Sequence, residues 1–201
     1  MGIEEECFIN VEHKKSSFLA EKNEALVERG LALLSTPVVE RKDQNEVKKM
    51  FENGLSMLDS ERYSEAVTCF DKIIAIVPRL WSAWRNKGVA LCYLNRFEEA
   101  LFYFDQSLNY CPDDECAFLN KGNALFSLKR YQESIDCFDM ALEYSPRDVL
   151  SLNSKGVALC YLNRQEEAIA CFNTVLSFDP NNETALKNKQ SAIEALNRKT
   201  K

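Results

Sequence analysis

The chain has 201 residues, of which 46% are hydrophobic and 28% charged, so it can bury a core and stay in solution. Its formal net charge of −6 argues against nucleic-acid binding, which depends on cationic contacts to phosphate, and gives no attraction to an anionic membrane. Only 6 Gly and 5 Pro are present, which argues against a collagen-like or disordered chain.

The first residues, 1–6, are acidic and are followed by no apolar run of the kind that a secretory signal needs. Glu6 stands where a myristoylation motif requires Ser or Thr. No segment reaches the roughly 20 apolar residues of a membrane span. We therefore expect a cytoplasmic protein that does not bind membranes and whose eight cysteines are reduced thiols.

Residues 1–44 form an N-terminal arm without an internal repeat. We expect residues 1–15 to be disordered and residues 17–34 to form one helix, which ends before Pro37. The arm could cap the first helix pair or bind a partner, and the sequence leaves both roles open. Residues 43–46 (Asp-Gln-Asn-Glu) resemble a capping box that would start the next helix.

From residue 45 onward, several residue types recur with a step of 34 residues. The recurring columns are Pro78, Pro112, Pro146 and Pro180; Gly54, Gly88, Gly122 and Gly156; Phe70, Phe104, Phe138 and Phe172; Ala66, Ala100, Ser134 and Ala168; and Arg62, Arg96, Arg130 and Arg164, each followed three residues later by Glu. A period held by so many residue types at once indicates a repeat protein.

Each unit is predicted to be a pair of helices. The small residue and the Phe four positions later share one helix face, the Pro ends that helix, and the Gly allows another helix to approach closely. The predicted first helices are 46–59, 80–94, 114–128 and 148–162, and the predicted second helices are 62–76, 97–110, 131–144 and 165–178. A final helix is predicted over 183–198, with a polar face suited to capping the stack.

The second unit carries a family resemblance in Trp84, Gly88, Leu91, Phe97, Ala100, Phe104 and Pro112. In these residues and in its period the chain resembles the tetratricopeptide repeat family. The resemblance implies an all-α, right-handed superhelical solenoid of antiparallel helix pairs, with four repeats over 45–180 and a capping helix and tail over 181–201. Gln165 and Met50 depart from the pattern. The pentatricopeptide family, which binds RNA, is less similar because its period is longer.

Catalytic and metal chemistry are not predicted. His13 is the only histidine, so few cysteines could have a neighbouring base, and the chain contains no glycine-rich phosphate loop. Cys111 and Cys116 flank a turn, but no second pair of ligands accompanies them. We expect no enzyme activity, no cofactor and no metal, and we interpret the cysteine columns as small core residues.

The resemblance also implies a binding site, because the first helix of each pair lines a concave groove in this family. The residues carried over are Lys48, Phe51 and Leu55 from repeat one, Arg85, Asn86, Val89 and Tyr93 from repeat two, Leu119, Asn120 and Asn123 from repeat three, and Asn153, Val157 and Tyr161 from repeat four. Amide side chains can both donate to and accept from an extended peptide. Alternatively, Asn86 and Asn120 only stabilise the stack.

The expected partner is a protein or peptide, bound by a scaffold that is monomeric or self-associates weakly. A co-chaperone that binds chaperone C-termini is an alternative, as is a self-associating scaffold. In this family, the members that bind chaperones hold a terminal carboxylate with two Lys, two Asn and one Arg. A clamp that began in repeat one would place its Lys and Asn at Phe51 and Leu55. A clamp that began in repeat two would place them at Arg85 and Val89, with Leu150 and Ser154 on the far side. Only the middle Asn, Asn86 or Asn120, is in place. The sequence therefore disfavours chaperone-tail binding.

Overall fold

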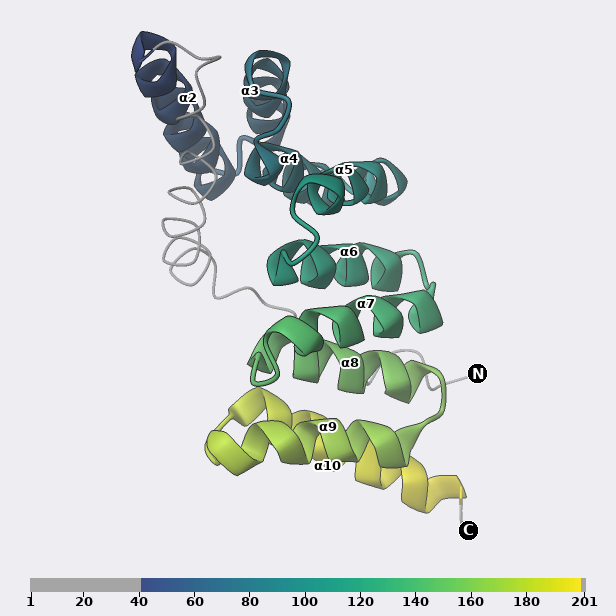
Figure 1. Ribbon diagram of the computed structural model, residues 1–201. Coiled ribbons are helices and arrows are strands. Elements are labelled where there is room, and N and C mark those ends of the chain that lie inside the picture. Colours follow the sequence, from purple (N-terminus) through teal and green to yellow (C-terminus); the bar gives the residue numbers. More distant parts are fainter. Residues whose placement is uncertain (1–40, 200–201) are drawn as a thin grey trace. The chain divides into compact units, whose positions relative to one another are not determined.

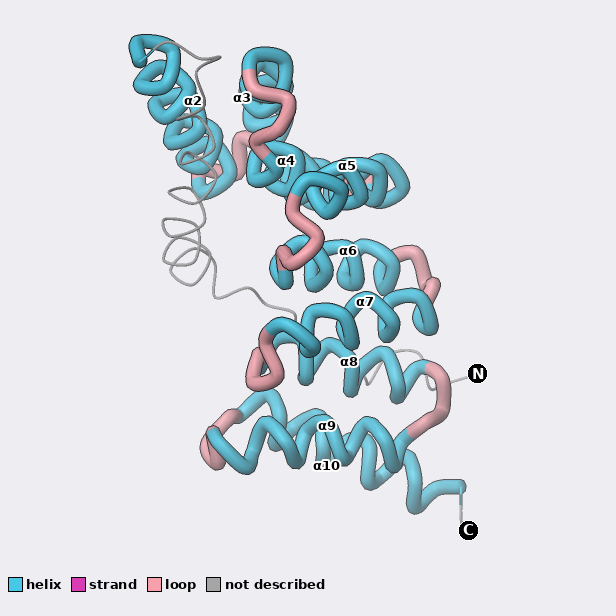
Figure 2. The backbone as a smooth tube through the Cα atoms, viewed as in Figure 1, coloured by secondary structure: helices cyan, strands magenta, loops and turns pink. Residues whose placement is uncertain are grey.

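The computed structural model describes residues 41–199, which form helices joined by short turns and contain no strand (Figures 1 and 2). The helices are α2 (Arg41–Asp59), α3 (Tyr63–Ile76), α4 (Trp81–Tyr93), α5 (Phe97–Tyr110), α6 (Glu115–Ser127), α7 (Tyr131–Tyr144), α8 (Val149–Tyr161), α9 (Gln165–Phe178) and α10 (Glu183–Lys199). The predicted all-α fold of helix pairs is confirmed.

The described chain divides into two compact blocks, and the division falls in the first turn of α6. The N-terminal block comprises residues 41–117 and the C-terminal block residues 118–199. In the N-terminal block α3 contacts both α2 and α4, and α4 contacts α5. In the C-terminal block α8 contacts both α7 and α9, and α10 contacts α9 and α8. Short loops reverse the chain between successive helices (Figure 2).

The predicted helix bounds agree with the structure to within one or two residues, except at the first helix. Helix α2 begins at Arg41, five residues before the predicted start at residue 46, because residues 41–45 contain neither Gly nor Pro to stop it. Asp43 therefore lies inside a helix, and the predicted capping box is wrong. The disordered segment and the helix predicted over residues 1–34 lie outside the described residues.

Each turn from a first helix to a second helix contains one residue in the left-handed region. These residues are Glu61, Asn95, Lys129 and Asn163, with φ between 57° and 61°. The next residue donates its N–H back across five residues, as Arg96 does to the carbonyl oxygen of Leu91 at 2.9 Å. This is the Schellman arrangement, which satisfies the last carbonyls of the helix. The turn repeats at each step of 34 residues.

The Gly and Phe columns meet within every helix pair. A Cβ built on Gly88 would lie 2.6 Å from Cε1 of Phe104, and one built on Gly122 would lie 2.5 Å from Cε1 of Phe138. Gly54 and Gly156 face Phe70 and Phe172 in the same way, and all four Phe side chains are fully buried. The prediction that the glycines permit a close approach is therefore confirmed.

Two of the first helices, α6 and α8, and the final helix α10 differ from α4 in how they start. Asp148 accepts the Ser151 N–H at 2.9 Å before α8, and Asn182 accepts the Ala185 N–H at 2.9 Å before α10. Asp114 accepts the Ala117 N–H at 3.2 Å before α6. The sequence analysis missed these N-caps, although Asp and Asn are the residues that cap helices best and the three recur at the 34-residue step.

Candidate peptide-binding surface

The candidate residues lie on the first helices of their repeats. On α4, Arg85, Val89 and Tyr93 are each four residues apart, and on α8 the same spacing relates Asn153, Val157 and Tyr161. Residues at that spacing share one helix face. Leu119, Asn120 and Asn123 lie on the part of α6 that belongs to the C-terminal block.

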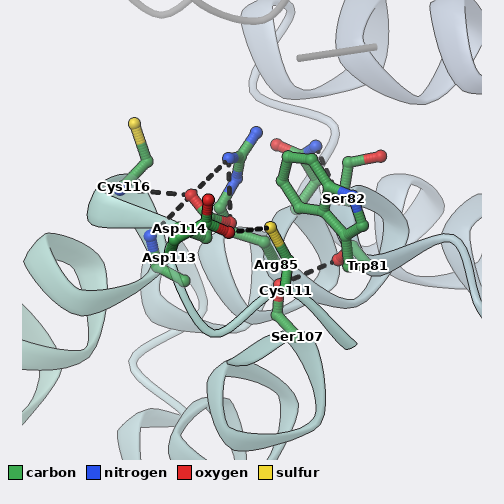
Figure 3. Close-up of polar contacts among 10 residues, drawn as sticks. Trp81, Ser82, Arg85, Ser107, Cys111, Asp113, Asp114 and Cys116 are labelled. Carbon is green, nitrogen blue, oxygen red and sulfur yellow. Dashed lines mark hydrogen bonds and ion pairs between the residues drawn. The ribbon is translucent and has the colours of Figure 1, made fainter. Parts of the chain in front are cut away.

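In the N-terminal block, Arg85 is part of the framework. Its Nη1 lies 3.0 and 3.1 Å from the two carboxylate oxygens of Asp114, and the two side chains are only 3% and 0% exposed (Figure 3). The guanidinium carbon also lies 5.2 Å from the ring centroid of Trp81. Because Asp114 also accepts the backbone N–H groups of Cys116 and Ala117, this ion pair ties α4 to the start of α6.

Further polar contacts hold the same region together. The Ser107 hydroxyl of α5 donates to the Trp81 carbonyl oxygen of α4 at 2.9 Å, and both residues are buried (Figure 3). The Cys111 thiol donates to the Asp113 carboxylate at 3.2 Å. The structure therefore places Arg85 in a buried network that connects α4, α5 and the following turn.

Asn86 is also buried and is bonded to its own helix. Its Nδ2 donates to the carbonyl oxygen of Ser82 at 2.8 Å. This contact favours the interpretation that Asn86 stabilises the stack. Of the carried-over residues of repeat one, Phe51 is fully buried and makes an edge-to-face contact with Phe70, whereas Lys48 is exposed and Leu55 is half-buried.

The two tyrosines at the ends of α4 and α8 have the same environment in their respective blocks. Tyr93 stacks on Tyr63 with ring centroids 4.6 Å apart, and Tyr161 stacks on Tyr131 at 4.9 Å. Tyr161 also meets Phe126 edge-on at 5.2 Å. Each tyrosine is half-buried, so part of its surface is exposed to solvent.

The amide side chains with the fewest hydrogen bonds to the rest of the protein lie in the C-terminal block. Asn120 and Asn123 are half-buried, and neither side chain has a hydrogen-bond partner within residues 41–199. Asn153 is buried, and its Oδ1 has no partner in that same range. Beside them, Leu119 is half-buried and Val157 is buried in the hydrophobic core of this block. Leu119, Asn120 and Asn123 therefore keep part of their surface exposed, whereas Asn153 and Val157 are buried.

Two lysines of the first helices are paired with the preceding second helix. Lys87 of α4 forms an ion pair with Asp71 of α3 and donates to the Tyr103 hydroxyl at 2.7 Å. Lys155 of α8 pairs with Asp139 of α7 at 2.5 Å. Each of these lysines therefore has an acidic partner within its own block.

The cysteines of the described chain are free thiols that fill space. Burial raises the pKa of the Cys92 thiol to about 12 and raises that of Cys171. Such thiols are poor nucleophiles, because the thiolate is the reactive form. Residues 41–199 contain no group of three or more His, Cys, Asp and Glu that could hold a metal ion. No helix in that range has both the length and the apolar composition to cross a bilayer.

Family models of the tetratricopeptide repeat match three consecutive segments of the chain, residues 81–114, 116–148 and 150–182. The chain is a tetratricopeptide repeat protein. Its matched repeats contain α4 to α9, and α2 and α3 precede them at the same 34-residue step. Membership of this family supports a role in protein–protein interaction.

Several solved structures have the same fold. A crystal structure of MamA is 14% identical, covers 75% of this chain and 82% of its own, and has a TM-score of 0.68. MamA from Desulfovibrio magneticus RS-1 is 19% identical, with coverages of 83% and 96% and a TM-score of 0.63. The first repeat domain of Spaghetti (RPAP3), bound to the HSP90 peptide SRMEEVD, is 22% identical, with coverages of 58% and 92% and a TM-score of 0.56. A search of curated proteins gave no match.

Proposed function

We propose that this tetratricopeptide repeat protein is an interaction scaffold whose first helices bind a peptide or protein segment. The observation that carries the proposal is the state of Asn120 and Asn123 on α6. Both amides are half-buried and have no hydrogen-bond partner among the described residues. An amide offers two donors and an acceptor, which complement the N–H and C=O groups of an extended backbone.

The surroundings divide the predicted residues into two groups. Arg85 and Asn86 support the fold, because their polar groups are bonded to Asp114 and to the α4 backbone. The group proposed to meet the ligand lies in the C-terminal block and consists of Leu119, Asn120, Asn123, Asn153, Val157 and Tyr161, whereas Val89 and Tyr93 are a separate candidate surface of the N-terminal block. This group combines amides with aromatic and aliphatic surface, so the preferred segment should carry apolar side chains and few acidic ones. We expect binding to occur in the cytoplasm, where thiols stay reduced.

A co-chaperone role is the second candidate, because the RPAP3 structure contains an HSP90 peptide. The residues of this chain argue against it. Phe51 is buried, and Leu150 and Ser154 carry no charge where a carboxylate clamp needs cations. Arg85 already has a carboxylate partner in Asp114. A terminal carboxylate would therefore find no preformed cationic clamp at these positions.

The proposal can be tested with a displayed library of random nonapeptides selected against the full chain. Enrichment of peptides with apolar side chains, bound by a chain whose measured mass is that of a monomer, is the expected result. A mass of two or more copies that does not change with peptide would favour the self-associating scaffold. Failure to enrich any sequence would contradict peptide capture.

A further inference from the structure

Helix α5, the second helix of its pair, presents an aromatic side chain to solvent. Phe102 is 54% exposed, and the exposed carboxylates of Glu98 and Asp105 lie four residues before it and three residues after it, on the same face. The opposite face of α5 carries the buried Ala100 and Phe104, which belong to the core. Phe102 is therefore not among the residues that hold α5 in the stack.

The other repeats show that the fold does not need a large apolar residue at this position. Thr68, Asp136 and Ala170 lie 34 residues apart at the position of Phe102, and all three are exposed. A polar or small side chain is sufficient in those repeats. A phenylalanine at an exposed position that Thr, Asp and Ala fill elsewhere indicates a role other than packing.

Phe102 stands at one end of a row of aromatic rings on α5 and α4. It meets Tyr103 edge-on, with ring centroids 5.2 Å apart, and Tyr103 stacks on Trp84 at 5.9 Å. Trp84 is in turn 6.3 Å from Tyr110, and its Nε1 donates to the carbonyl oxygen of Pro78 at 2.7 Å. The exposed ring of Phe102 thus rests on a support that is held by stacking and by a hydrogen bond.

The charge of α5 selects the kind of partner that this face attracts. The helix contains three carboxylates, Glu98, Glu99 and Asp105, and neither Lys nor Arg. Arg96, which precedes the helix, pairs with Glu99 at 2.7 Å. A carboxylate has two oxygens and about four acceptor sites, so Glu98 and Asp105 can accept from an incoming cation while keeping other contacts. The face around Phe102 therefore suits a cation.

The protein already places cations over aromatic rings elsewhere. The Lys87 Nζ lies 4.0 Å from the ring centroid of Tyr103, and the Arg147 guanidinium carbon lies 5.0 Å from that of Phe178. Such contacts are favourable because the face of an aromatic ring is electronegative. A guanidinium from a partner would make the same contact with the exposed ring of Phe102.

We propose that the outer face of α5, centred on Phe102, is a second interaction surface that binds a basic segment of a partner protein. An arginine of that segment lies over the Phe102 ring and donates to the carboxylates of Glu98 and Asp105, one helical turn to either side. Arginine fits better than lysine, because its planar guanidinium stacks on a ring and presents several donors at once. This surface is separate from the candidate residues on the first helices, so one chain can hold two partners.

The test measures the affinity of octa-arginine and octa-lysine peptides for the full chain by titration calorimetry. The two probes carry the same charge, so a preference for octa-arginine of about fivefold is expected from stacking on Phe102. Phe102→Ala should weaken octa-arginine about fivefold and abolish the preference. Phe102→Thr, which copies the residue of the first repeat, should do the same with an unchanged thermal midpoint. The double variant Glu98→Gln, Asp105→Asn should weaken both peptides.

Matched controls show whether the effect is local. Tyr144→Ala removes an aromatic side chain of α7 that is 46% exposed, and Glu166→Gln neutralises an exposed carboxylate of α9. Both should bind octa-arginine normally. Asn120→Ala should also bind it normally, so that failure of the peptide site on the first helices and failure of this surface are distinguishable.

The ring itself supplies a direct readout, since the aromatic resonances of Phe102 should shift when octa-arginine is added. Equal affinities of the parent chain for the two peptides, or unchanged octa-arginine binding by both Phe102 variants, would overturn the inference. Tighter binding by the full chain carrying Lys14→Ala and Lys15→Ala would mean that the chain's own basic residues cover Phe102, and would overturn the choice of a partner protein. A dimer that dissociates in Phe102→Ala would overturn it in favour of a second copy.

Discussion

Arg85 and Asp114 lie 29 positions apart in the chain and form a buried ion pair, with Nη1 3.0 Å from Oδ1. Both partners have other contacts, because Arg85 lies over Trp81 and Asp114 caps α6. The pair therefore links the first helix of one repeat to the start of the next. It also removes Arg85 from the set of cations that could bind a ligand.

Replacing Asp114 by Ala should strongly destabilise the protein. The change leaves the Arg85 charge buried without its partner, which costs about 3–5 kcal/mol, and it removes an N-cap worth ~1 kcal/mol. Chemical denaturation of the variant measures the loss. Glu99→Gln, which breaks the exposed pair with Arg96, is the control and should change the midpoint little. Equal midpoints for the two variants would contradict the structural role of Asp114.

Gly122→Leu should overpack the contact with Phe138. A Cβ at residue 122 already lies 2.5 Å from Cε1 of that fully buried ring, so the ring or the helix must move. Overpacking typically costs ~1–3 kcal/mol. Ala170→Leu, on the exposed side of α9, adds a similar bulk, one carbon less, without the contact and serves as control. A denaturation midpoint for Gly122→Leu that matches the control would show that the ring yields freely.

The stability of the fold should fall in mild acid. A hydrogen bond from the Arg three residues earlier lowers the pKa of Glu65, Glu99, Glu133 and Glu167 below the ordinary value of 4.5. A group with a lowered folded-state pKa stabilises the protein above its unfolded pKa, and this contribution is lost as pH falls through the folded value. When the thermal midpoint is measured from pH 7 to pH 3, it should therefore decline once the pH is below about 4.5.

A variant with all four of these glutamates changed to Gln isolates their share of the pH dependence. It should show a smaller decline in thermal midpoint between pH 5 and pH 3 than the parent chain. High salt should shrink the difference, since the pairs are exposed and screened. Identical pH profiles for the two chains would mean that the Arg–Glu pairs do not contribute.

The peptide SRMEEVD should bind no better than a scrambled peptide of the same composition. The clamp positions hold Phe51, Leu150 and Ser154, and Arg85 is committed to Asp114. Titration calorimetry of the two peptides against the full chain decides the point. Tighter binding of SRMEEVD than of the scrambled peptide would contradict this prediction and favour the co-chaperone alternative.

Much of the fold follows from local sequence. The 34-residue period predicts where helices start and stop, as in α7, predicted over 131–144 and found over Tyr131–Tyr144. The Gly–Phe contact is also predictable, because only a residue without Cβ allows that approach. The N-caps Asp114, Asp148 and Asn182 could have been found from their position between proline and helix.

The site was harder to predict, because its residues depend on partners distant in the sequence. Arg85 looks like a surface residue until Asp114, 29 positions later, is placed beside it. Asn86 and Asn120 occupy the same position in successive repeats, yet Asn86 is bonded to Ser82 whereas Asn120 has no partner among the described residues. The position in the repeat determines where a side chain lies on its helix. Residues from other parts of the chain determine how buried it is and whether its polar groups are hydrogen-bonded.

The most direct test of the central claim compares Asn120→Ala with Asn86→Ala, measuring for each the affinity for the selected nonapeptide and the thermal midpoint. The claim that half-buried amides of the first helices bind a protein segment predicts opposite behaviour. Asn120→Ala should bind about tenfold more weakly with a nearly unchanged midpoint, whereas Asn86→Ala should lower the midpoint. Normal affinity of Asn120→Ala, with or without a loss of stability, would contradict the claim.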